Sequence, residues 1–283
     1  MTTQQTPLID GSGPQQLGCA GIPSWAINDR CFSLKGRMKA EANLPKNAST
    51  VILIRPETSG RKFEVFLTLR PPEMNFMGGV YVFPGGSVEE GDYSEEMLER
   101  CRGLSPVEAQ RNLGNELSPE LSLGHWVAGI RELFEEVGIL FSVSDGGKKL
   151  DTRHEELKKR LTEKRHALVR EALDFRFLLE SEGLYCDVGR LAYFSHRVTP
   201  EKYSVRFDTR FYLAALPPDQ SPLSSSQEVT EGLWLTPQQA LQRAQNAGFP
   251  MMPPTLAALR TLAALGSWQN LREQYQLETR QVL

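Results

Sequence analysis

Residues 130–140 read IRELFEEVGIL, and the apolar positions of this stretch recur at the spacing of one buried helix face. These positions are Ile130, Leu133, Phe134 and Val137. Gly138 follows them and supplies the usual helix stop. The stretch therefore predicts an amphipathic helix that packs on a core and ends at Gly138.

The opposite face of this predicted helix carries Glu132, Glu135 and Glu136. Two of these glutamates are one turn apart and two lie near the negative end of the helix dipole, and each such defect costs roughly 0.3–1 kcal/mol. Only Arg131, four residues before Glu135, offers local relief. A solvated face is the usual explanation of a Glu-rich helix, but it leaves this repulsion unexplained. A divalent cation would explain it, because ions such as Mg²⁺ take oxygen ligands and usually also hold substrate phosphates.

The composition is that of an ordinary soluble globular protein with one large domain or two small ones: 283 residues, 40% hydrophobic and 24% charged. The net charge of −3, without a Lys/Arg-rich tail, argues against nonspecific nucleic-acid binding. No apolar run reaches the ~18 residues of a membrane span, and residues 1–18 lack the layout of a signal peptide. The cysteines lack metal spacing, which indicates reduced thiols and a cytoplasmic location. They are Cys19, Cys31, Cys101 and Cys186.

Strand and helix patterns are mixed along the rest of the chain. The predicted strands lie at residues 51–56, 62–70, 81–86, 191–200, 204–217 and 232–236. The predicted helices lie at residues 93–104, 105–114 and about 152–182, then from Thr236 onward and after 251–254. The helix at 152–182 is highly charged and is predicted to be mostly solvated. A hairpin signal joins the first two strands, so the pattern favours an α+β class built as an α/β/α sandwich.

The acidic helix resembles part of a known family motif. Residues 131–139, RELFEEVGI, match the REUxEExGU half of the Nudix box at every specified position. The first half, G-x5-E, is found from Gly86 to Asp92, with aspartate in place of the usual glutamate. The two halves of the box are usually separated by seven residues. Here they are separated by residues 93–130, which are 38 residues, so an insertion of 31 residues splits the box.

The resemblance to the Nudix hydrolases covers roughly residues 48–240. It implies an α/β/α sandwich with a mixed sheet that hydrolyses a nucleoside diphosphate linked to another group. We expect residues 1–47 to be an N-terminal extension and residues 241–283 to be a helical C-terminal tail packed on the domain. The helical insertion, at about 93–123, is expected to project from the loop that precedes the catalytic helix and to cover the substrate cleft.

The resemblance also implies roles for the acidic residues. Glu132, Glu135 and Glu136 would be ligands of Mg²⁺ or Mn²⁺ or would activate water, and Arg131 would orient a glutamate. The predicted catalytic residues are therefore Arg131, Glu132 and Glu135, and the identity of the general base stays open. A further acidic ligand usually comes from outside the box, and Glu228 is the expected one.

Glu231 is the alternative to Glu228, because both belong to the polar segment before the predicted strand at 232–236. Either could instead be an exposed loop glutamate. Gly85 and Gly86 are predicted substrate-binding residues, because glycine lets a loop approach a pyrophosphate closely.

A second resemblance narrows the substrate. Leu67-Thr68-Leu69-Arg70, then Gly79 and Phe83-Pro84-Gly85-Gly86, have the spacing that coenzyme A-cleaving Nudix enzymes show before their box. The middle departs from that motif, with Pro71 in place of serine or alanine and Asn75 in place of arginine. Three features resemble those of peroxisomal-type coenzyme A diphosphatases: the split box, the sequence FMGGVYVFPGG and the later sequence RFDTRFYL. This chain ends Arg-Gln-Val-Leu rather than in a peroxisomal address, so the cytoplasm is again expected.

Three arginines are candidate phosphate contacts. Arg70 ends the LTLR run, which could also be an inner strand with one exposed arginine. Arg206, Asp208 and Arg210 alternate along one predicted strand and so share a face. The two arginines could clamp phosphates there, or the three residues could form a structural ion-pair ladder. His125 and His196 lack metal-spaced partners and are expected to be packing or surface residues.

The leading functional hypothesis is metal-dependent hydrolysis of coenzyme A or acyl-coenzyme A to 3′,5′-ADP and (acyl-)phosphopantetheine. The alternative is the same chemistry on ADP-ribose, NADH or another dinucleotide or nucleotide-sugar. A third reading is a non-catalytic Nudix-fold sensor, against which the complete glutamate set counts. The expected partner is a small-molecule nucleotide, without nucleic acid or membrane, and a homodimer is one alternative for the oligomeric state.

Overall fold

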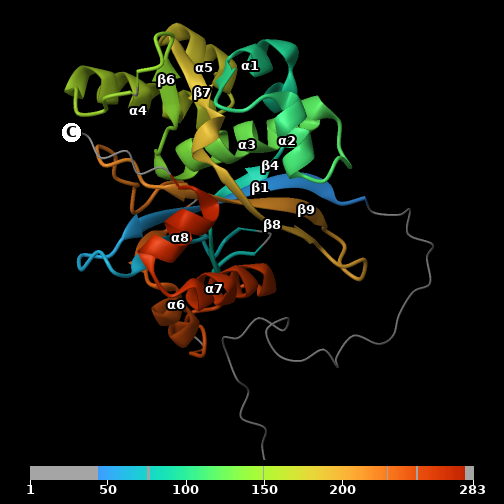
Figure 1. Ribbon diagram of the computed structural model, residues 1–283, viewed down its shortest axis with the longest axis vertical. Coiled ribbons are helices and arrows are strands. Elements are labelled where there is room, and N and C mark those ends of the chain that lie inside the picture. Colours follow the sequence, from blue (N-terminus) through green and yellow to red (C-terminus); the bar gives the residue numbers. More distant parts are fainter. Residues whose placement is uncertain (1–43, 75–76, 149, 228, 247, 278–283) are drawn as a thin grey trace, which may run out of the picture. The chain divides into compact units, whose positions relative to one another are not determined.

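The computed structural model describes residues 44–74, 77–148, 150–227, 229–246 and 248–277 (Figure 1). Most of the predicted N-terminal extension, residues 1–47, therefore lies outside the described residues, as do Cys19 and Cys31. The domain boundaries expected at residues 48 and 240 stay a prediction.

One mixed sheet of seven strands organises the described chain. Its main path runs β10 (Glu231–Leu235), β2 (Phe63–Leu69), β1 (Lys46–Pro56), β9 (Phe207–Ala215), β8 (Ala192–Val198). Two short strands join it: β3 (Tyr81–Val82) pairs with β2, and β4 (Gly85–Ser87) pairs with β1. β1 pairs with β9 in parallel and with β2 antiparallel, so the predicted hairpin is confirmed. Each predicted strand run contains a strand of this sheet.

Helices cover both faces of the sheet (Figure 1). β1 is central and buried on both sides, because its successive side chains point to opposite faces. Val51 and Leu53 pack on the side of α3 (Pro119–Val137), whereas Ile52 and Ile54 pack on the side of α7. The second side is covered by the C-terminal helices α6 (Pro237–Arg243), α7 (Pro253–Leu265) and α8 (Trp268–Tyr275). The expected α/β/α sandwich with a mixed sheet is confirmed.

A small second sheet joins two segments on the α3 side. Its order is β5 (Cys101–Arg102), β7 (Leu184–Asp187), β6 (Ser142–Ser144). Around it lie α1 (Glu95–Glu99), α2 (Pro106–Asn112), α4 (Glu155–Val169) and α5 (Phe175–Ser181), and the turns η2 (Glu90–Tyr93) and η3 (Val188–Arg190). The box insertion and the helices after α3 are thus connected by backbone pairing, in which Cys101 lies opposite Cys186.

The prediction of one long helix at 152–182 is wrong. The chain leaves α4 after Val169, and Glu171 adopts a left-handed backbone conformation with φ 55°. Asp174 then caps α5 by accepting a hydrogen bond from the Phe177 amide. A side-chain cap of this kind starts a new helix, because it satisfies a backbone donor that has no partner within the helix. The break turns residues 168–177 into a corner.

The acidic helix α3 is longer than its sequence stripe and has defined ends. Ser118 caps it by accepting from the Leu121 amide, and Gly138 ends it in the left-handed conformation with φ 76°. The stop at Gly138 is confirmed. None of the helices among the described residues has the length and apolar character that crossing a membrane requires.

Candidate functional site

Arg131 holds the two halves of the split box together. Its Nε and Nη2 atoms donate to the two carboxylate oxygens of Asp92, each at 2.9 Å. Nη2 also donates to the carbonyl oxygen of Ser87 at 2.8 Å. Nη1 donates to Glu132 at 2.9 Å and more weakly to Glu135 at 3.4 Å. The two parallel donors of the guanidinium match the geometry of a carboxylate. Asp92 is therefore the carboxylate partner of Arg131, although 38 residues separate the two halves of the box.

The glycine turn presses directly against this helix. A Cβ atom on Gly86 would collide with the carboxylate of Glu132, and one on Gly85 would collide with the carbonyl oxygen of Ser49. Gly85 also has φ +155°, where a side chain would be strained. Gly85 therefore requires glycine, whereas a side chain at position 86 would force the Glu132 carboxylate to move. The β4 backbone thus lies next to Glu132.

The buried carboxylates outnumber the cation beside them. Burial raises the pKa of Glu132 to about 7, although Arg131 acts in the opposite direction. Burial likewise raises the pKa of Glu135, again against the effect of Arg131. Burial alone would lower the pKa of Arg131, but its hydrogen bond and ion pair with Asp92 more than offset this, so the guanidinium stays charged. The site as a whole favours the binding of additional positive charge.

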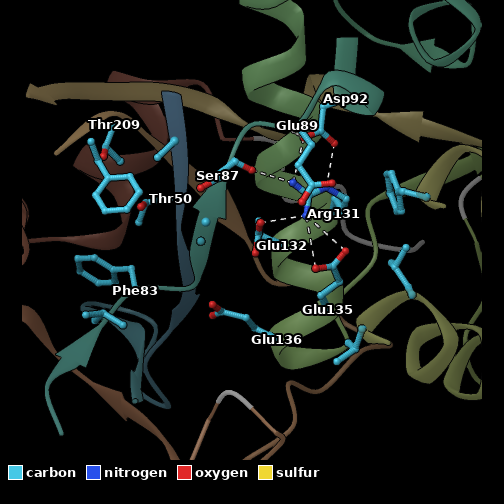
Figure 2. A pocket seen from close by; sticks show the side chains of 18 of the residues that line it. Thr50, Phe83, Ser87, Glu89, Asp92, Arg131, Glu132, Glu135, Glu136 and Thr209 are labelled. Atoms are coloured by element: carbon cyan, nitrogen blue, oxygen red, sulfur yellow. Dashed lines mark hydrogen bonds and ion pairs between the residues drawn. The ribbon is translucent and has the colours of Figure 1, made fainter. Parts of the chain in front are cut away.

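These side chains open on a large cavity of about 1360 Å³. It exceeds the ~300–1000 Å³ typical of small-ligand pockets, which suits a dinucleotide-sized molecule. Figure 2 shows Glu132 and Glu136 pointing from α3 toward the side of Thr50 and Phe83. The predicted site residues that line the cavity are Arg70, Gly85, Gly86, Arg131, Glu132, Glu135 and Glu136.

Arg70 is a cavity-lining cation that has no counterion among the residues that the structure describes. It follows β2, and backbone hydrogen bonds with Gly79 and Val80 hold its main chain in place. Its Nε atom is buried without a hydrogen-bond partner, and no ion pair to its guanidinium is formed among the described residues. A guanidinium in this state is well placed to receive an anionic ligand.

Arg206 and Arg210 do not line the cavity. Strand alternation instead brings Phe207, Thr209 and Phe211 to the cavity. Arg210 is 2% exposed and pairs with Asp208, which in turn pairs with His196. The geometry favours the structural ion-pair alternative for this face, and phosphate binding by Arg206 and Arg210 stays a prediction.

The expected extra acidic ligand is not placed. Glu228 lies outside the described residues, so its role stays a prediction. Glu231, the alternative, accepts a hydrogen bond from the Tyr81 hydroxyl at 2.8 Å and does not line the cavity.

The donor chemistry fits an oxygen-seeking divalent ion. No three His, Cys, Asp or Glu side chains within the described ranges already lie close enough together to hold a metal ion. Nevertheless Glu132, Glu135 and Glu136 all line one cavity, and Glu132, Glu135 and Asp92 share the single guanidinium of Arg131. Hard carboxylate oxygens are the ligands that Mg²⁺ and Mn²⁺ prefer.

Two helical segments differ from expectation in their relation to the cavity. Within residues 93–121 of the insertion, only Ser94 lines it in the described structure, whereas Met97, Cys101 and Ala109 belong to the buried core. The corner at residues 168–177 lines the cavity extensively. Sequence reasoning missed this corner because it treated the segment as a continuous solvated helix. Glu89, also missed, lines the cavity beside Asp92.

The fold and the site together define a Nudix protein: a mixed sheet between helical layers, with a glycine turn facing a glutamate-bearing helix. The chain belongs to the family described as the NUDT19 Nudix domain, whose model matches residues 45–262. The resemblance expected from the split box is thereby confirmed.

Relatives and solved structures agree with this assignment. The chain is 27% identical over 229 residues to the acyl-coenzyme A diphosphatase NUDT19 of Xenopus laevis, covering 71% of this chain and 60% of that protein. It is 29% identical over 246 residues to the protein of the same name in Gallus gallus, covering 75% and 64%. The crystal structure of a NUDIX hydrolase from Alicyclobacillus acidocaldarius matches with TM-score 0.65 and 27% identity, over 83% of this chain and 97% of that chain. The chain thus spans somewhat less than two thirds of the length of these two curated relatives.

Proposed function

We propose that this protein hydrolyses the pyrophosphate bond of coenzyme A or acyl-coenzyme A, giving 3′,5′-ADP and (acyl-)phosphopantetheine, with Mg²⁺ or Mn²⁺. The observation that supports coenzyme A as the substrate is the position of Arg70. This arginine has no counterion among the described residues and lies in the cavity that the glutamates line. Coenzyme A has a 3′-phosphate that such a cation can bind, and ADP-ribose and NADH lack it. The names of the relatives from Xenopus laevis and Gallus gallus support the same substrate class.

In this proposal Glu132, Glu135 and Glu136 hold the divalent metal, with Glu228 as a further ligand. The metal, when bound, neutralises pyrophosphate charge and makes a bound water more acidic. Arg131 keeps Glu132 and Glu135 oriented through its contacts at 2.9 and 3.4 Å.

The reaction needs one water molecule and no other reactant. The water oxygen forms a bond to one phosphorus, and the bond from that phosphorus to the bridging oxygen breaks. One of the glutamates takes the proton of the attacking water, and the bridging oxygen leaves on the other phosphate. Gly85 and Gly86 let the β4 backbone approach the phosphates, because no side chain stands between them.

A cytoplasmic location is part of the proposal. The described cysteines, Cys101 and Cys186, are free and buried although they lie opposite each other in neighbouring strands. Free thiols in such a position are consistent with a reducing compartment.

The decisive experiment is a substrate panel on the full chain. Coenzyme A, dephospho-coenzyme A, ADP-ribose and NADH are compared with Mg²⁺, with Mn²⁺ and with EDTA, and products are identified by mass. We expect metal-dependent release of 3′,5′-ADP, with the highest kcat/KM of the panel for coenzyme A. A tenfold or larger preference for ADP-ribose or NADH would overturn the substrate. Absence of turnover on the whole panel, with binding retained, would favour a sensor.

A further inference from the structure

The residues that line the cavity come mainly from two regions, the sheet and the corner between α4 and α5, and we call these the sheet arm and the helical arm. The sheet arm lies on the side of Thr50, Phe83 and Thr209, toward which Glu132 and Glu136 point (Figure 2). Its other lining residues include Arg70, Phe207 and Phe211. The helical arm is the corner between α4 and α5, at residues 168–177. Its apolar lining residues are Leu168, Val169, Leu173, Phe175 and Phe177.

The helical arm is fixed beside Glu135. Arg165 on α4 donates a hydrogen bond to the carbonyl oxygen of Glu135, which ties the end of α4 to the C-terminal turn of α3. Leu168 and Phe175 are buried in the core beneath the corner, at 7% and 5% exposure. The helical arm is therefore held in place by core packing and lies next to Glu135, one of the proposed metal ligands.

Charge separates the two arms. Arg70 gives the sheet arm a cation without a described counterion. The helical arm contributes the carboxylates of Glu171 and Asp174, and its cation, Arg176, is already paired with Glu180 at 2.7 Å. A phosphate group is attracted to Arg70 in the sheet arm and repelled by Glu171 and Asp174 in the helical arm. The nucleotide half of a substrate therefore belongs in the sheet arm, with its 3′-phosphate at Arg70.

The helical arm suits an apolar ligand instead. Phe177 is a large apolar side chain that lines the cavity and is 49% exposed, and Val169 and Leu173 are half-buried beside it. Apolar surface at the mouth of a pocket is typical of a ligand-binding surface, because a ligand that covers it removes it from water.

We propose that residues 168–177 bind the acyl-pantetheine half of an acyl-coenzyme A substrate, with the apolar acyl chain lying on Leu173 and Phe177. This inference rests on the proposed function and adds the orientation of the substrate: the 3′-phosphate at Arg70, the pyrophosphate at the glutamates and the acyl chain at the α4–α5 corner. It also assigns chain-length preference to that corner.

The first test measures binding of the two products separately, by calorimetry with Mg²⁺ present. The ligands are 3′,5′-ADP and decanoyl-phosphopantetheine, and the proteins are wild type, Arg70→Ala, Phe177→Ser and Val107→Ser. Val107 is also an exposed apolar residue, at 47%, but it lies on α2 and does not line the cavity. We expect Phe177→Ser to weaken decanoyl-phosphopantetheine roughly fivefold or more and Arg70→Ala to weaken 3′,5′-ADP roughly tenfold or more. Each variant should leave the other product within about twofold, and Val107→Ser should change neither.

The second test measures kcat/KM for coenzyme A, acetyl-coenzyme A and decanoyl-coenzyme A. Phe177→Ser should lower the value for decanoyl-coenzyme A roughly fivefold or more while that for coenzyme A changes by less than about twofold. Phe177→Leu, which keeps an apolar side chain, should restore most of the loss. Thermal unfolding of each variant checks that the fold is retained.

Three results would overturn the inference. The first is an equal loss of kcat/KM for decanoyl-coenzyme A and coenzyme A in Phe177→Ser. The second is the opposite binding pattern, in which Arg70→Ala weakens decanoyl-phosphopantetheine and Phe177→Ser weakens 3′,5′-ADP. The third is a wild-type kcat/KM that does not depend on acyl-chain length. The proposed function fails in a different way, because wild-type protein would then cleave no coenzyme A substrate or would prefer ADP-ribose or NADH by tenfold or more. Cleavage of coenzyme A with unchanged Phe177→Ser kinetics would retain the function and remove only the assignment of the helical arm.

Discussion

Two stripes of charged residues, one on helix α3 and one on strand β9, lie on neighbouring elements and have opposite surroundings. On α3, Glu132, Glu135 and Glu136 face a cavity of about 1360 Å³. On β9, Asp208 and Arg210 pair with each other and lie away from the cavity, which their strand neighbours line instead. Both stripes contain ion pairs, but on α3 the carboxylates of Glu132 and Glu135 share one guanidinium with Asp92, beside a space that a ligand can enter. The position of the charges relative to the cavity, rather than their presence, distinguishes the candidate site from packing.

The largest expected effect is on turnover through the α3 stripe. Glu135→Gln or Glu136→Gln should lower kcat roughly a hundredfold or more, because each removes a ligand or proton acceptor from the reaction centre while preserving side-chain shape. Glu120→Gln is the matched control, since Glu120 is exposed in the first turn of the same helix. Near-normal turnover of a Glu135 or Glu136 variant at saturating substrate and low metal would remove that residue from the site.

A second effect compares the two buried arginines. Arg131→Met and Arg210→Met each remove one partner of a buried ion pair, at 5% and 2% residue exposure, and should each lower the free energy of unfolding by about 3–5 kcal/mol. Urea denaturation measures this loss. At a temperature where both variants are folded, only Arg131→Met should also lose turnover, because Arg131 orients glutamates of the cavity. A comparable loss of kcat/KM in folded Arg210→Met would mean that the β9 stripe contributes to the site.

A third effect separates Arg70 from the β9 arginines. Arg70→Ala should lower kcat/KM for coenzyme A by roughly ten- to a hundred-and-fifty-fold and should affect dephospho-coenzyme A much less, since that analogue lacks the 3′-phosphate. Arg206→Ala is the comparison, because Arg206 does not line the cavity. If the β9 stripe is a structural ion-pair ladder, this variant should alter neither substrate by more than about twofold. An equal loss on both substrates would assign Arg70 to the pyrophosphate or to structure. A large loss with Arg206→Ala and a small one with Arg70→Ala would instead support phosphate binding by the arginines of β9.

Local pattern was enough to predict the α3 stripe. The helix, its stop at Gly138 and the hairpin of β1 and β2 follow from spacing that a few neighbouring residues determine. The sequence predicts the glycines at 85 and 86 for their approach to phosphate, and the structure adds close contacts, of Gly85 with the Ser49 backbone and of Gly86 with the Glu132 carboxylate. Alternation likewise predicted that Arg206, Asp208 and Arg210 share a face. It could not say which face lines the cavity, because that depends on the elements that pack on the sheet.

The two helical segments around α3 show the same limit. The insertion was expected to cover the cleft, yet Met97 and Ala109 lie in the core, at 1% and 0% exposure. The corner at 168–177 was taken for part of a solvated helix, because charged residues before it dominate the pattern. Its break depends on the left-handed Glu171 and the Asp174 cap, and its position depends on the Arg165 contact with the end of α3. Such tertiary contacts leave no periodic signal in a single sequence.

The smallest expected effect is the pH dependence of Glu132. Its pKa in the folded chain is raised from 4.5 to about 7, chiefly by burial, so the stability that its protonated form provides is lost as pH rises toward 7. In EDTA, Glu132→Gln should therefore raise Tm by roughly 2–4 °C at pH 8, corresponding to about 1 kcal/mol, and by much less at pH 5, where the wild-type carboxyl is largely protonated. Added Mg²⁺ should stabilise wild type more than the variant at pH 8, because the ion compensates the carboxylate charge that the variant lacks. A Tm difference that stays constant between pH 5 and pH 8 would mean that Glu132 is not the group that titrates there, and an equal response to Mg²⁺ would separate Glu132 from the metal site.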